Sequence, residues 1–260
     1  IMGRETADAA LAMALDYARA IRKTPIVVND SRGFYASRVV GTYLREGHLL
    51  LTEGVPPALI ENVARMAGMP VGPLALTDEV AVDLAWKILK ATEADLGPAA
   101  IDPKQKTLLA EMVEKRSRYG RKNGKGFYDY PQNAAKRLWS GLADLQPSKR
   151  NVDDIDIAEI KRRLLGIQAL ESARCIEEKV VTDVREADVG SILGFGFAPF
   201  TGGTISYIDG MGVKNFVQMC NTLAAAHGER FKPSKLLIDM ANKGETFYGR
   251  FAPAKRKAVA

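Results

Sequence analysis

Residues 25–38 read Pro25-Ile26-Val27-Val28-Asn29-Asp30-Ser31-Arg32-Gly33-Phe34-Tyr35-Ala36-Ser37-Arg38, and the chain changes character inside this stretch. Residues 26–28 are three β-branched residues in succession, which is typical of a buried strand. Residues 29–31 have short polar side chains that can accept hydrogen bonds from the first N–H groups of a helix. Gly33 lets the backbone pass closely before that helix begins. The stretch therefore predicts a strand, a turn and the start of a long helix.

The residues upstream of this stretch predict one helix and no sheet. Residues 6–22 are rich in alanine and leucine, a strongly helical composition. A helix followed by one buried strand is typical of the end of an α/β domain, yet no earlier strand provides a sheet for it to join. The chain also begins with Ile1 instead of methionine. We therefore interpret the chain as a fragment, and we expect residues 25–28 to be poorly packed or paired with something foreign.

Composition indicates a globular chain without a membrane span. Of the 260 residues 47% are apolar and 26% are charged, close to the globular average. The net charge of +6 comes from scattered basic residues that have acids nearby, which argues against nucleic-acid binding. The two cysteines and two histidines show no metal-ligand spacing. No apolar run approaches the ~20 residues that cross a bilayer.

Downstream of the opening stretch the sequence predicts a series of helices. Helices are expected at residues 34–53 and 57–67, from Thr77 or Asp78 to 94, and at 104–115. A basic glycine turn covers residues 119–131, and residues 139–151 are interpreted as a linker.

The second half repeats this order. A helix at residues 155–178 is followed by residues 180–193, a glycine-rich turn at 194–203 and a capped helix near Asp209. Glu53 then corresponds to Glu178 and Pro73 to Pro199 at nearly the same offset, and Asp78 corresponds to Asp209. The sequence therefore predicts a tandem duplication of a helical domain.

Two glycine-rich segments resemble phosphate-binding loops only in part. Residues 194–199 start like a dinucleotide-binding loop, but Pro199 replaces the third glycine and a helix precedes it, so a tight turn is expected. Residues 122–126 lack the Gly-Lys-Ser/Thr ending of a phosphate loop. That turn is either solvated or meets a phosphorylated ligand through its charge.

The two histidines are assigned structural roles. Ser37 and His48 share one helix face, but eleven residues at 1.5 Å each separate them by about 16 Å. Proton transfer needs about 3 Å, so His48 is excluded as a general base for Ser37. His227 precedes Gly228 at an expected helix end, where a cation favours the helix dipole.

Three groups of residues resemble the C-terminal region of NAD-dependent 3-hydroxyacyl-CoA dehydrogenases: residues 23–34 with Arg38, residues 69–73 and residues 122–128. Residues 194–203 and Glu177-Glu178 resemble the extra domain of the multifunctional fatty-acid oxidation proteins. The resemblance implies a mainly all-α fold with two tandem helical domains like the C-terminal domain of 6-phosphogluconate dehydrogenase, preceded by a helix-strand remnant of a Rossmann domain. The implied boundaries are residues 1–31 for the remnant of the NAD-binding domain, 32–138 for the first helical domain and 152–260 for the second.

The resemblance also implies a function. Members of the family oxidise (S)-3-hydroxyacyl-CoA to 3-ketoacyl-CoA in β-oxidation. Their catalytic His/Glu pair and NAD loop would lie upstream of Ile1. The isolated chain is therefore expected to bind no NAD and to be inactive, and to form the acyl-CoA-facing wall and an intramolecular dimer-like interface. The implied partners are acyl-CoA, a thiolase subunit and further copies of the chain, in the cytoplasm.

The resemblance names three candidate site residues. Ser37 stands at the position of a family asparagine that supports the catalytic histidine and binds substrate. Phe34 is assigned to substrate binding beside it, and Leu193 stands where some long members carry an aromatic substrate contact. Ser37 has the alternative role of capping or back-bonding in the first helical turn. The alternatives for the whole chain are a non-catalytic helical module for dimerisation or partner binding, and a helical domain of another hydroxyacid dehydrogenase.

Overall fold

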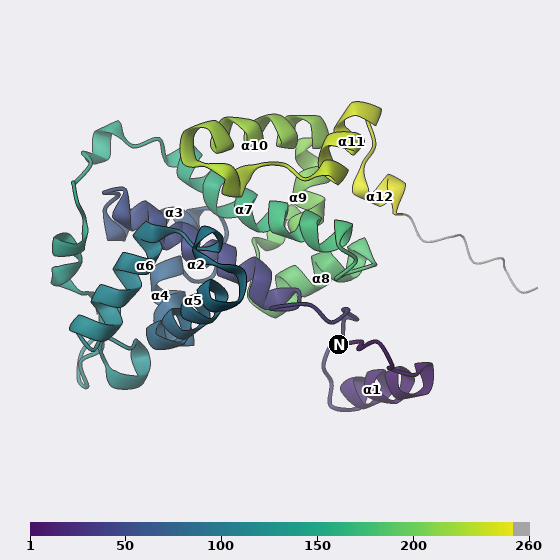
Figure 1. Ribbon diagram of the computed structural model, residues 1–260, viewed down its shortest axis with the longest axis horizontal. Helices are drawn as coiled ribbons and strands as arrows, with labels where there is room; N and C mark the ends of the chain where they lie inside the picture. Colours follow the sequence, from purple (N-terminus) through teal and green to yellow (C-terminus); the bar gives the residue numbers. More distant parts are fainter. Residues whose placement is uncertain (252–260) are drawn as a thin grey trace, which may run out of the picture. The chain divides into compact units, whose positions relative to one another are not determined.

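The computed structural model describes residues 1–251, which form a chain of helices with one very short hairpin (Figure 1). The chain divides into two compact units. We call Tyr43–Leu164 the central unit, and residues 1–42 together with the chain from Leu165 onward the terminal unit. The dividing points lie inside α2 (Ala36–Thr52) and α7 (Ile157–Glu177). The predicted mainly all-α fold is confirmed, whereas the domain boundaries taken from the resemblance stay a prediction.

The central unit contains the end of α2, the start of α7 and everything between them. Its buried side chains are mostly aliphatic and come from every α-helix of the unit. Its short β1–β2 hairpin is antiparallel, with Tyr128 opposite Leu138. The remaining elements are α3 (Pro57–Met66), α4 (Pro73–Val80), α5 (Val82–Leu96), η1 (Pro98–Ala100), α6 (Pro103–Ala110), η2 (Glu111–Lys115), η3 (Arg121–Asn123), β1 (Tyr128–Asp129), β2 (Arg137–Leu138), η4 (Ser140–Leu145) and η5 (Val152–Asp154).

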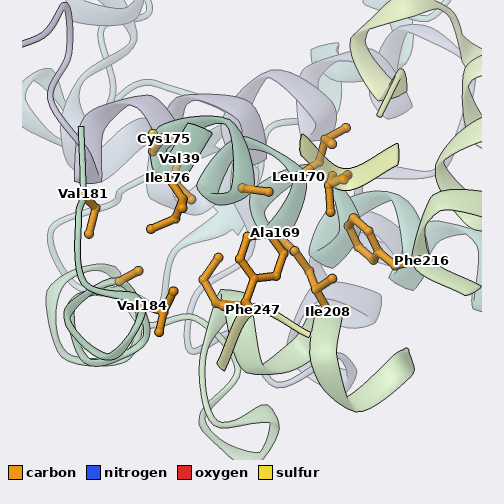
Figure 2. Packing of buried hydrophobic residues seen from close by; sticks show 14 of the residues in the cluster. Val39, Ala169, Leu170, Cys175, Ile176, Val181, Val184, Ile208, Phe216 and Phe247 are labelled. Atoms are coloured by element: carbon orange, nitrogen blue, oxygen red, sulfur yellow. The ribbon is translucent and has the colours of Figure 1, made fainter. Parts of the chain in front are cut away.

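The terminal unit joins the N-terminal segment to the C-terminal helices. Figure 2 shows its apolar core, where Val39 from α2 lies among side chains of α7 and later elements. Phe216 and Phe247 are fully buried in the same cluster. The elements are α1 (Asp8–Ala20), the start of α2, the rest of α7, α8 (Val184–Phe195), η6 (Pro199–Thr201), α9 (Thr204–Met211), α10 (Val213–His227), η7 (Glu229–Phe231), α11 (Lys235–Lys243) and α12 (Phe247–Arg250).

Each unit has two helices where the sequence predicted one. The helix expected from Thr77 or Asp78 begins at Pro73, and a single residue, Ala81 at φ 93°, separates α4 from α5. The helix expected near Asp209 is likewise divided, by Gly212 at φ 85°. The predicted starts are wrong because these polar side chains lie within α4 and α9, where they bind other segments of the chain and do not cap a helix.

The predicted strand at residues 25–28 is not a regular strand. Its end forms an isolated parallel bridge in which Val28 accepts a hydrogen bond from Met2 N at 2.7 Å. Asn29 N donates to the carbonyl of Val180 at 2.8 Å. Val28 is only 8% exposed, so the expectation of poor packing is wrong for this residue. The preceding helix is confirmed as α1, in which no residue is buried.

The segment interpreted as a linker is bound to the central unit. Leu142 within η4 is buried, and Gln146 Nε2 donates to the carbonyls of Leu51 and Val55. Arg150 N donates to the carbonyl of Gly54. The linker interpretation is therefore wrong, because these bonds satisfy carbonyl groups at the end of α2.

Two carboxylates organise the central unit. Glu61 on α3 accepts hydrogen bonds from two backbone N–H groups in the first turn of α4, and from the hydroxyl of Tyr128. Asp78 in α4 accepts from the backbone N–H groups of Phe127 and Tyr128 at 2.7 and 2.8 Å. The first N–H groups of a helix have no acceptor within the helix. In α4, the Glu61 carboxylate accepts hydrogen bonds from two of these groups.

The terminal unit contains the same network. Asp188 on α8 accepts from two backbone N–H groups in the first turn of α9, and from the hydroxyl of Tyr248. Asp209 in α9 accepts from the N–H groups of Phe247 and Tyr248. The two units therefore repeat one hydrogen-bonding scheme between a pair of carboxylates and a Phe-Tyr dipeptide.

This network corrects the residue pairing that the sequence predicted. Asp78 and Asp209 are equivalent in it, as predicted, because each is the sixth residue of its helix. Pro73 and Pro199 are not equivalent. Pro73 opens α4, whereas Pro199 opens η6 and the first residue of α9 is Thr204.

Candidate functional site

The candidate residue Phe34 lies in a tight turn just before α2, and the candidate residue Ser37 is the second residue of that helix. Phe34 N donates to the carbonyl of Ser31 at 3.0 Å, and Arg38 N donates to that of Gly33 at 3.2 Å. Gly33 and Phe34 both have positive φ, 75° and 50°. A left-handed conformation costs an aromatic residue on the order of 1–3 kcal/mol, so the turn at Phe34 is strained.

The polar residues before this turn do not cap α2. The helix begins at Ala36, five residues after Ser31. Asn29 instead donates through Nδ2 to the carbonyl of Lys179 at 2.7 Å. The predicted helix-start role of residues 29–31 is therefore wrong, apart from the turn that the Ser31 carbonyl closes.

Tyr35 anchors the start of α2 inside the terminal unit. Its side chain is 1% exposed, and its hydroxyl lies 2.9 Å from the carbonyl of Ala187, 3.2 Å from Ser172 Oγ and 3.1 Å from Thr204 Oγ1. Its ring meets Phe195 edge-on, with centroids 5.8 Å apart. Burial raises the pKa of Tyr35 well above its ordinary value, so the hydroxyl stays protonated.

Arg38 forms a second anchor one turn further along α2. Its guanidinium donates through Nε to Glu171 at 2.8 Å and through both terminal nitrogens to Glu178. Arg174 also pairs with Glu171, at 3.0 Å. Glu171 on α7 and Glu178 just after α7 therefore hold the first turn of α2 through Arg38. The planar guanidinium can bind both carboxylates at once, which a lysine ammonium group would not reproduce.

Ser37 lies between these two anchors in the sequence. The residue is exposed, and its hydroxyl forms no hydrogen bond with any residue that the structure describes. The alternative role of Ser37 as a capping or back-bonding serine is therefore wrong. Phe34 is 39% exposed, so both candidate residues present their side chains to solvent.

Leu193 belongs to the same unit as Phe34 and Ser37. It is 68% exposed near the end of α8. Glu186, Gly190 and Leu193 share one face of this helix. Glu186 Oε2 accepts a hydrogen bond from Val27 N at 2.8 Å, and Gly190 packs against Ile26 so closely that a Cβ would lie 2.6 Å from Ile26 Cδ1. Leu193 thus lies one turn beyond the contact with residues 26–27.

Sequence reasoning missed Tyr35 as a site-supporting residue, because an aromatic residue near the start of an amphipathic helix ordinarily belongs to the apolar side of that helix. The available signal was Arg38, which the resemblance includes but to which it gave no role. Its partners Glu171 and Glu178 lie 133 and 140 positions further along the chain. A single sequence does not reveal a pairing at that separation.

The basic glycine turn of the central unit forms ion pairs with α4 and α5. Arg121 pairs with Glu79 at 2.8 Å and Lys122 with Asp83 at 2.5 Å, so two of its cations are already neutralised. Burial raises the pKa of Asp78 to about 6, although the hydrogen bonds that it accepts oppose this shift. A Cβ at Gly126 would lie 2.0 Å from Asp78 Oδ1. The glycine is needed for close packing on Asp78, which favours the structural interpretation over phosphate binding.

His48 lies in the core of the central unit, as its structural role predicts. It is 1% exposed and stacks on Phe127 with ring centroids 5.3 Å apart. Gln105 Nε2 lies 3.2 Å from Nδ1, and Thr77 Oγ1 lies 3.0 Å from Nε2. Burial lowers the pKa of His48 to about 3, so the ring is neutral at physiological pH.

Residues 1–251 contain neither a cluster of metal-ligating side chains nor a helix that could span a membrane. Among these residues no group of three or more His, Cys, Asp or Glu side chains is placed to hold a metal ion. No helix within the same range is both long enough and apolar enough to cross a membrane.

Comparison with known proteins shows which family one part of the chain resembles. Residues 33–130 match the family model of the 3-hydroxyacyl-CoA dehydrogenase C-terminal domain. The similarity to that domain family extends over this part of the chain. The matched range begins at the strained turn and ends just after the Phe-Tyr dipeptide and the β1 strand.

Nearly the whole chain resembles part of one kind of longer protein. It is 38% identical to the fatty acid oxidation complex subunit alpha of Shewanella loihica over 94% of the chain. It is 39% identical to that of Shewanella frigidimarina over 95% and 37% identical to that of Vibrio cholerae over 94%. The chain spans about a third, 34%, of the length of these relatives.

Two solved structures share the fold. A 3-hydroxybutyryl-CoA dehydrogenase from Escherichia coli K12 matches with a TM-score of 0.72 and 18% identity, over 94% of this chain and 66% of that one. The dehydrogenase part of multifunctional enzyme 1 from Caenorhabditis elegans matches with a TM-score of 0.65 and 24% identity, over 92% and 54%. At these identities the likeness shows the fold alone.

Proposed function

We propose that the chain is the C-terminal part of an NAD-dependent 3-hydroxyacyl-CoA dehydrogenase, which oxidises (S)-3-hydroxyacyl-CoA to 3-ketoacyl-CoA in fatty-acid β-oxidation. The observation that carries this proposal is the 37–39% identity to fatty acid oxidation complex alpha subunits over 94–95% of the chain. The family match of residues 33–130 supports it. The repeated carboxylate network supports the further proposal that two tandem helical domains make up the chain.

In this proposal the start of α2 and the end of α8 belong to the wall that faces acyl-CoA. Phe34 and Leu193 are exposed apolar side chains of one unit. Ser37 belongs to the same unit and adds an exposed hydroxyl group. Apolar side chains suit the acyl chain, while a serine can donate or accept one hydrogen bond to a polar substrate group.

Among residues 1–251, the glycine-rich segment at the end of α8 does not fit NAD. The segment that begins like a dinucleotide loop, Gly194-Phe195-Gly196, lies at the end of α8, and Gly196 is the left-handed residue that ends the helix. A dinucleotide loop instead follows a strand and opens a helix. We therefore place the cofactor site and the proton-abstracting pair in another part of the full-length protein. The absence of buried residues in α1 supports this, since a helix of 13 residues needs a packed partner.

The isolated chain is expected to be inactive. Mixed with acetoacetyl-CoA and NADH, it should leave the nicotinamide absorbance unchanged relative to a protein-free blank. The full-length protein serves as the positive control and should consume NADH. Steady loss of NADH with the isolated chain alone would contradict this assignment of the chemistry to other residues.

Replacing Ser37 by alanine in the full-length protein is expected to lower kcat/KM for 3-hydroxyacyl-CoA about fivefold to tenfold, which corresponds to one lost hydrogen bond. The substitution should not destabilise α2, because alanine favours helices. Ser140→Ala, at an exposed serine in the central unit, is the matched control and should leave the rate unchanged. Steady-state kinetics at saturating NAD measures both variants.

A second candidate function follows from the names of the relatives, which are subunits of a complex. In it the chain is a non-catalytic helical module that dimerises or holds a partner subunit such as a thiolase. If Ser37→Ala leaves both kcat and KM unchanged, the module is favoured over the acyl-CoA wall. With either function, we propose that the full-length protein is cytoplasmic.

A further inference from the structure

The strained turn before α2 needs an external constraint. Phe34 at φ 50° would gain free energy by moving to an ordinary backbone conformation, and it follows a second left-handed residue, Gly33. Strained conformations persist only where the surrounding structure holds them, and they concentrate at functional sites. The constraint must come from residues next to the turn, because Phe34 itself is 39% exposed.

Tyr35 supplies such a constraint with no bonding capacity left over. The phenol has one O–H to donate, and the carbonyl of Ala187 can only accept it, at 2.9 Å. The phenolic oxygen is then left to accept from the hydroxyls of Ser172 and Thr204, at 3.2 and 3.1 Å. One hydroxyl therefore joins α2 to α7, α8 and α9 at a buried point, where leaving any of these groups unpaired is costly.

The two hydroxyls that bind Tyr35 are specific to this place. In the central unit the positions equivalent to Ser172 and Thr204 hold Gly47 and Pro73, which pack directly on each other. A Cβ at Gly47 would lie 2.4 Å from Pro73 Cβ. The same helix crossing is thus apolar and closed in one unit, and hydroxyl-lined around Tyr35 in the other.

We propose that Tyr35 and Arg38 are positioning residues, which hold the strained Gly33-Phe34 turn on the C-terminal helices and thereby set the direction of Phe34 and Ser37. The proposal rests on the proposed function for the identity of the substrate. It assigns the C-terminal helices a part in the site, since all the partners of these two anchors lie on α7, α8 and α9 or at the C-terminal end of α7. The anchors act from either side of Ser37, three residues apart.

Amide hydrogen exchange on the chain itself tests the anchoring. Tyr35→Phe should raise the exchange rates of the Phe34 and Arg38 amides, which close the turn, about fivefold to tenfold. The matched control is Tyr43→Phe. Tyr43 is buried on the same helix and its hydroxyl donates only to the carbonyl of Val71, so these two amides should keep their rates. Equal exchange at Phe34 and Arg38 in both variants would overturn the proposal.

A second variant separates anchoring from general loosening. Asparagine tolerates a left-handed conformation far better than phenylalanine, so Phe34→Asn relieves the strain. Added to Tyr35→Phe, it should restore at least half of the lost protection of Arg38 N–H. If the double variant exchanges as fast as Tyr35→Phe, strain at Phe34 is not what Tyr35 restrains, and the proposal fails.

Kinetics of the full-length protein test the consequence for the site. Tyr35→Phe and Arg38→Lys should each raise KM for 3-hydroxyacyl-CoA about fivefold and leave KM for NAD unchanged, since they displace only the acyl-CoA wall. A lower kcat with both KM values unchanged would show a merely structural role and overturn the proposal. Arg163→Lys, at a buried arginine that pairs with Glu46 and Glu53 in the central unit, is the control for Arg38→Lys.

The two arms fail in different ways. If the full-length protein oxidises no 3-hydroxyacyl-CoA, the proposed function is wrong while hydrogen exchange still decides whether Tyr35 holds the turn. If oxidation is normal but the Phe34 and Arg38 amides do not respond to Tyr35→Phe, the proposed function stands and the positioning role is excluded.

Discussion

Replacing Gly126 by alanine is expected to lower the free energy of unfolding of the central unit by about 3 to 5 kcal/mol. The added Cβ would lie 2.0 Å from Asp78 Oδ1, so the carboxylate has to move. Asp78 would then lose its bonds to the N–H groups of Phe127 and Tyr128 and to the hydroxyl of Tyr130. A buried N–H group without a partner costs about 1–3 kcal/mol, and the N–H groups of Phe127 and Tyr128 would both lose their acceptor.

Urea denaturation followed by tryptophan fluorescence reports this effect from the central unit, because both tryptophans, Trp86 and Trp139, belong to it. Gly124→Ala is the control in the same turn. A Cβ there meets nothing closer than the carbonyl oxygen of Tyr130 at 3.7 Å, so only the strain of its positive φ remains, about 1 kcal/mol. Equal losses in the two variants would contradict the role given to Asp78.

His48 is expected to make the central unit less stable as the pH falls from 6.5 to 4.5, by about 2 to 3 kcal/mol. Its neutral form is fixed by its neighbours. Gln105 Nε2 can only donate, so Nδ1 accepts, and Thr77 gives its own proton to the carbonyl of Pro73, so Nε2–H donates to Thr77. A protonated ring would confront the Gln105 amide with a second donor inside the core.

The direction follows from the two pKa values of His48. In the unfolded chain the ring takes up a proton near its ordinary value of 6.5, whereas in the folded unit burial lowers the pKa to about 3. Between these values the unfolded state binds one more proton, so stability is lost as the pH falls. Below about pH 3 the folded state also binds it and the loss stops growing.

The measurement compares the wild-type chain with His48→Gln at pH 7.0, 5.5 and 4.5 by the same fluorescence method. Glutamine can donate and accept but does not titrate, so the stability difference between the two proteins should change by about 1.4 kcal/mol per pH unit below pH 6.5. The difference is the proper quantity, because burial raises the pKa of Asp78 to about 6 and that of Glu61 as well, which stabilises the folded unit as the pH falls. A difference that does not vary with pH would exclude the buried neutral ring.

Local sequence chemistry was sufficient for most helices. The helix of residues 34–53 appears as Ala36–Thr52 and that of 155–178 as Ile157–Glu177. Gly54, with φ 87°, follows the end of the first of these helices. Composition, periodicity and glycine stops are properties of neighbouring residues, so they can be recognised before any tertiary contact is known.

The errors arose where a polar residue serves a distant segment. Thr77 and Asp78 have the composition of a helix start, but they lie within α4 and bind His48 and the Phe127-Tyr128 backbone. The buried hydrogen bonds that Thr77 and Asp78 make within α4 outweigh the preference of these residue types for the N-terminal cap of a helix. For the same reason residues 139–151 were interpreted as a linker, although Gln146 satisfies two carbonyls at the end of α2.

The sequence by itself was sufficient to predict a mainly helical chain and the equivalence of Asp78 and Asp209 in the two repeats. It also showed that residues 23–34, 69–73 and 122–128 resemble one dehydrogenase family. These predictions depend on local propensity and on motifs, and both can be recognised in the sequence without the structure. The hold of Tyr35 and Arg38 on α7, α8 and α9 becomes visible only in the folded chain. Hydrogen bonds join residues more than 130 positions apart there, and the geometry that makes a buried hydroxyl or guanidinium favourable exists only after the helices have packed.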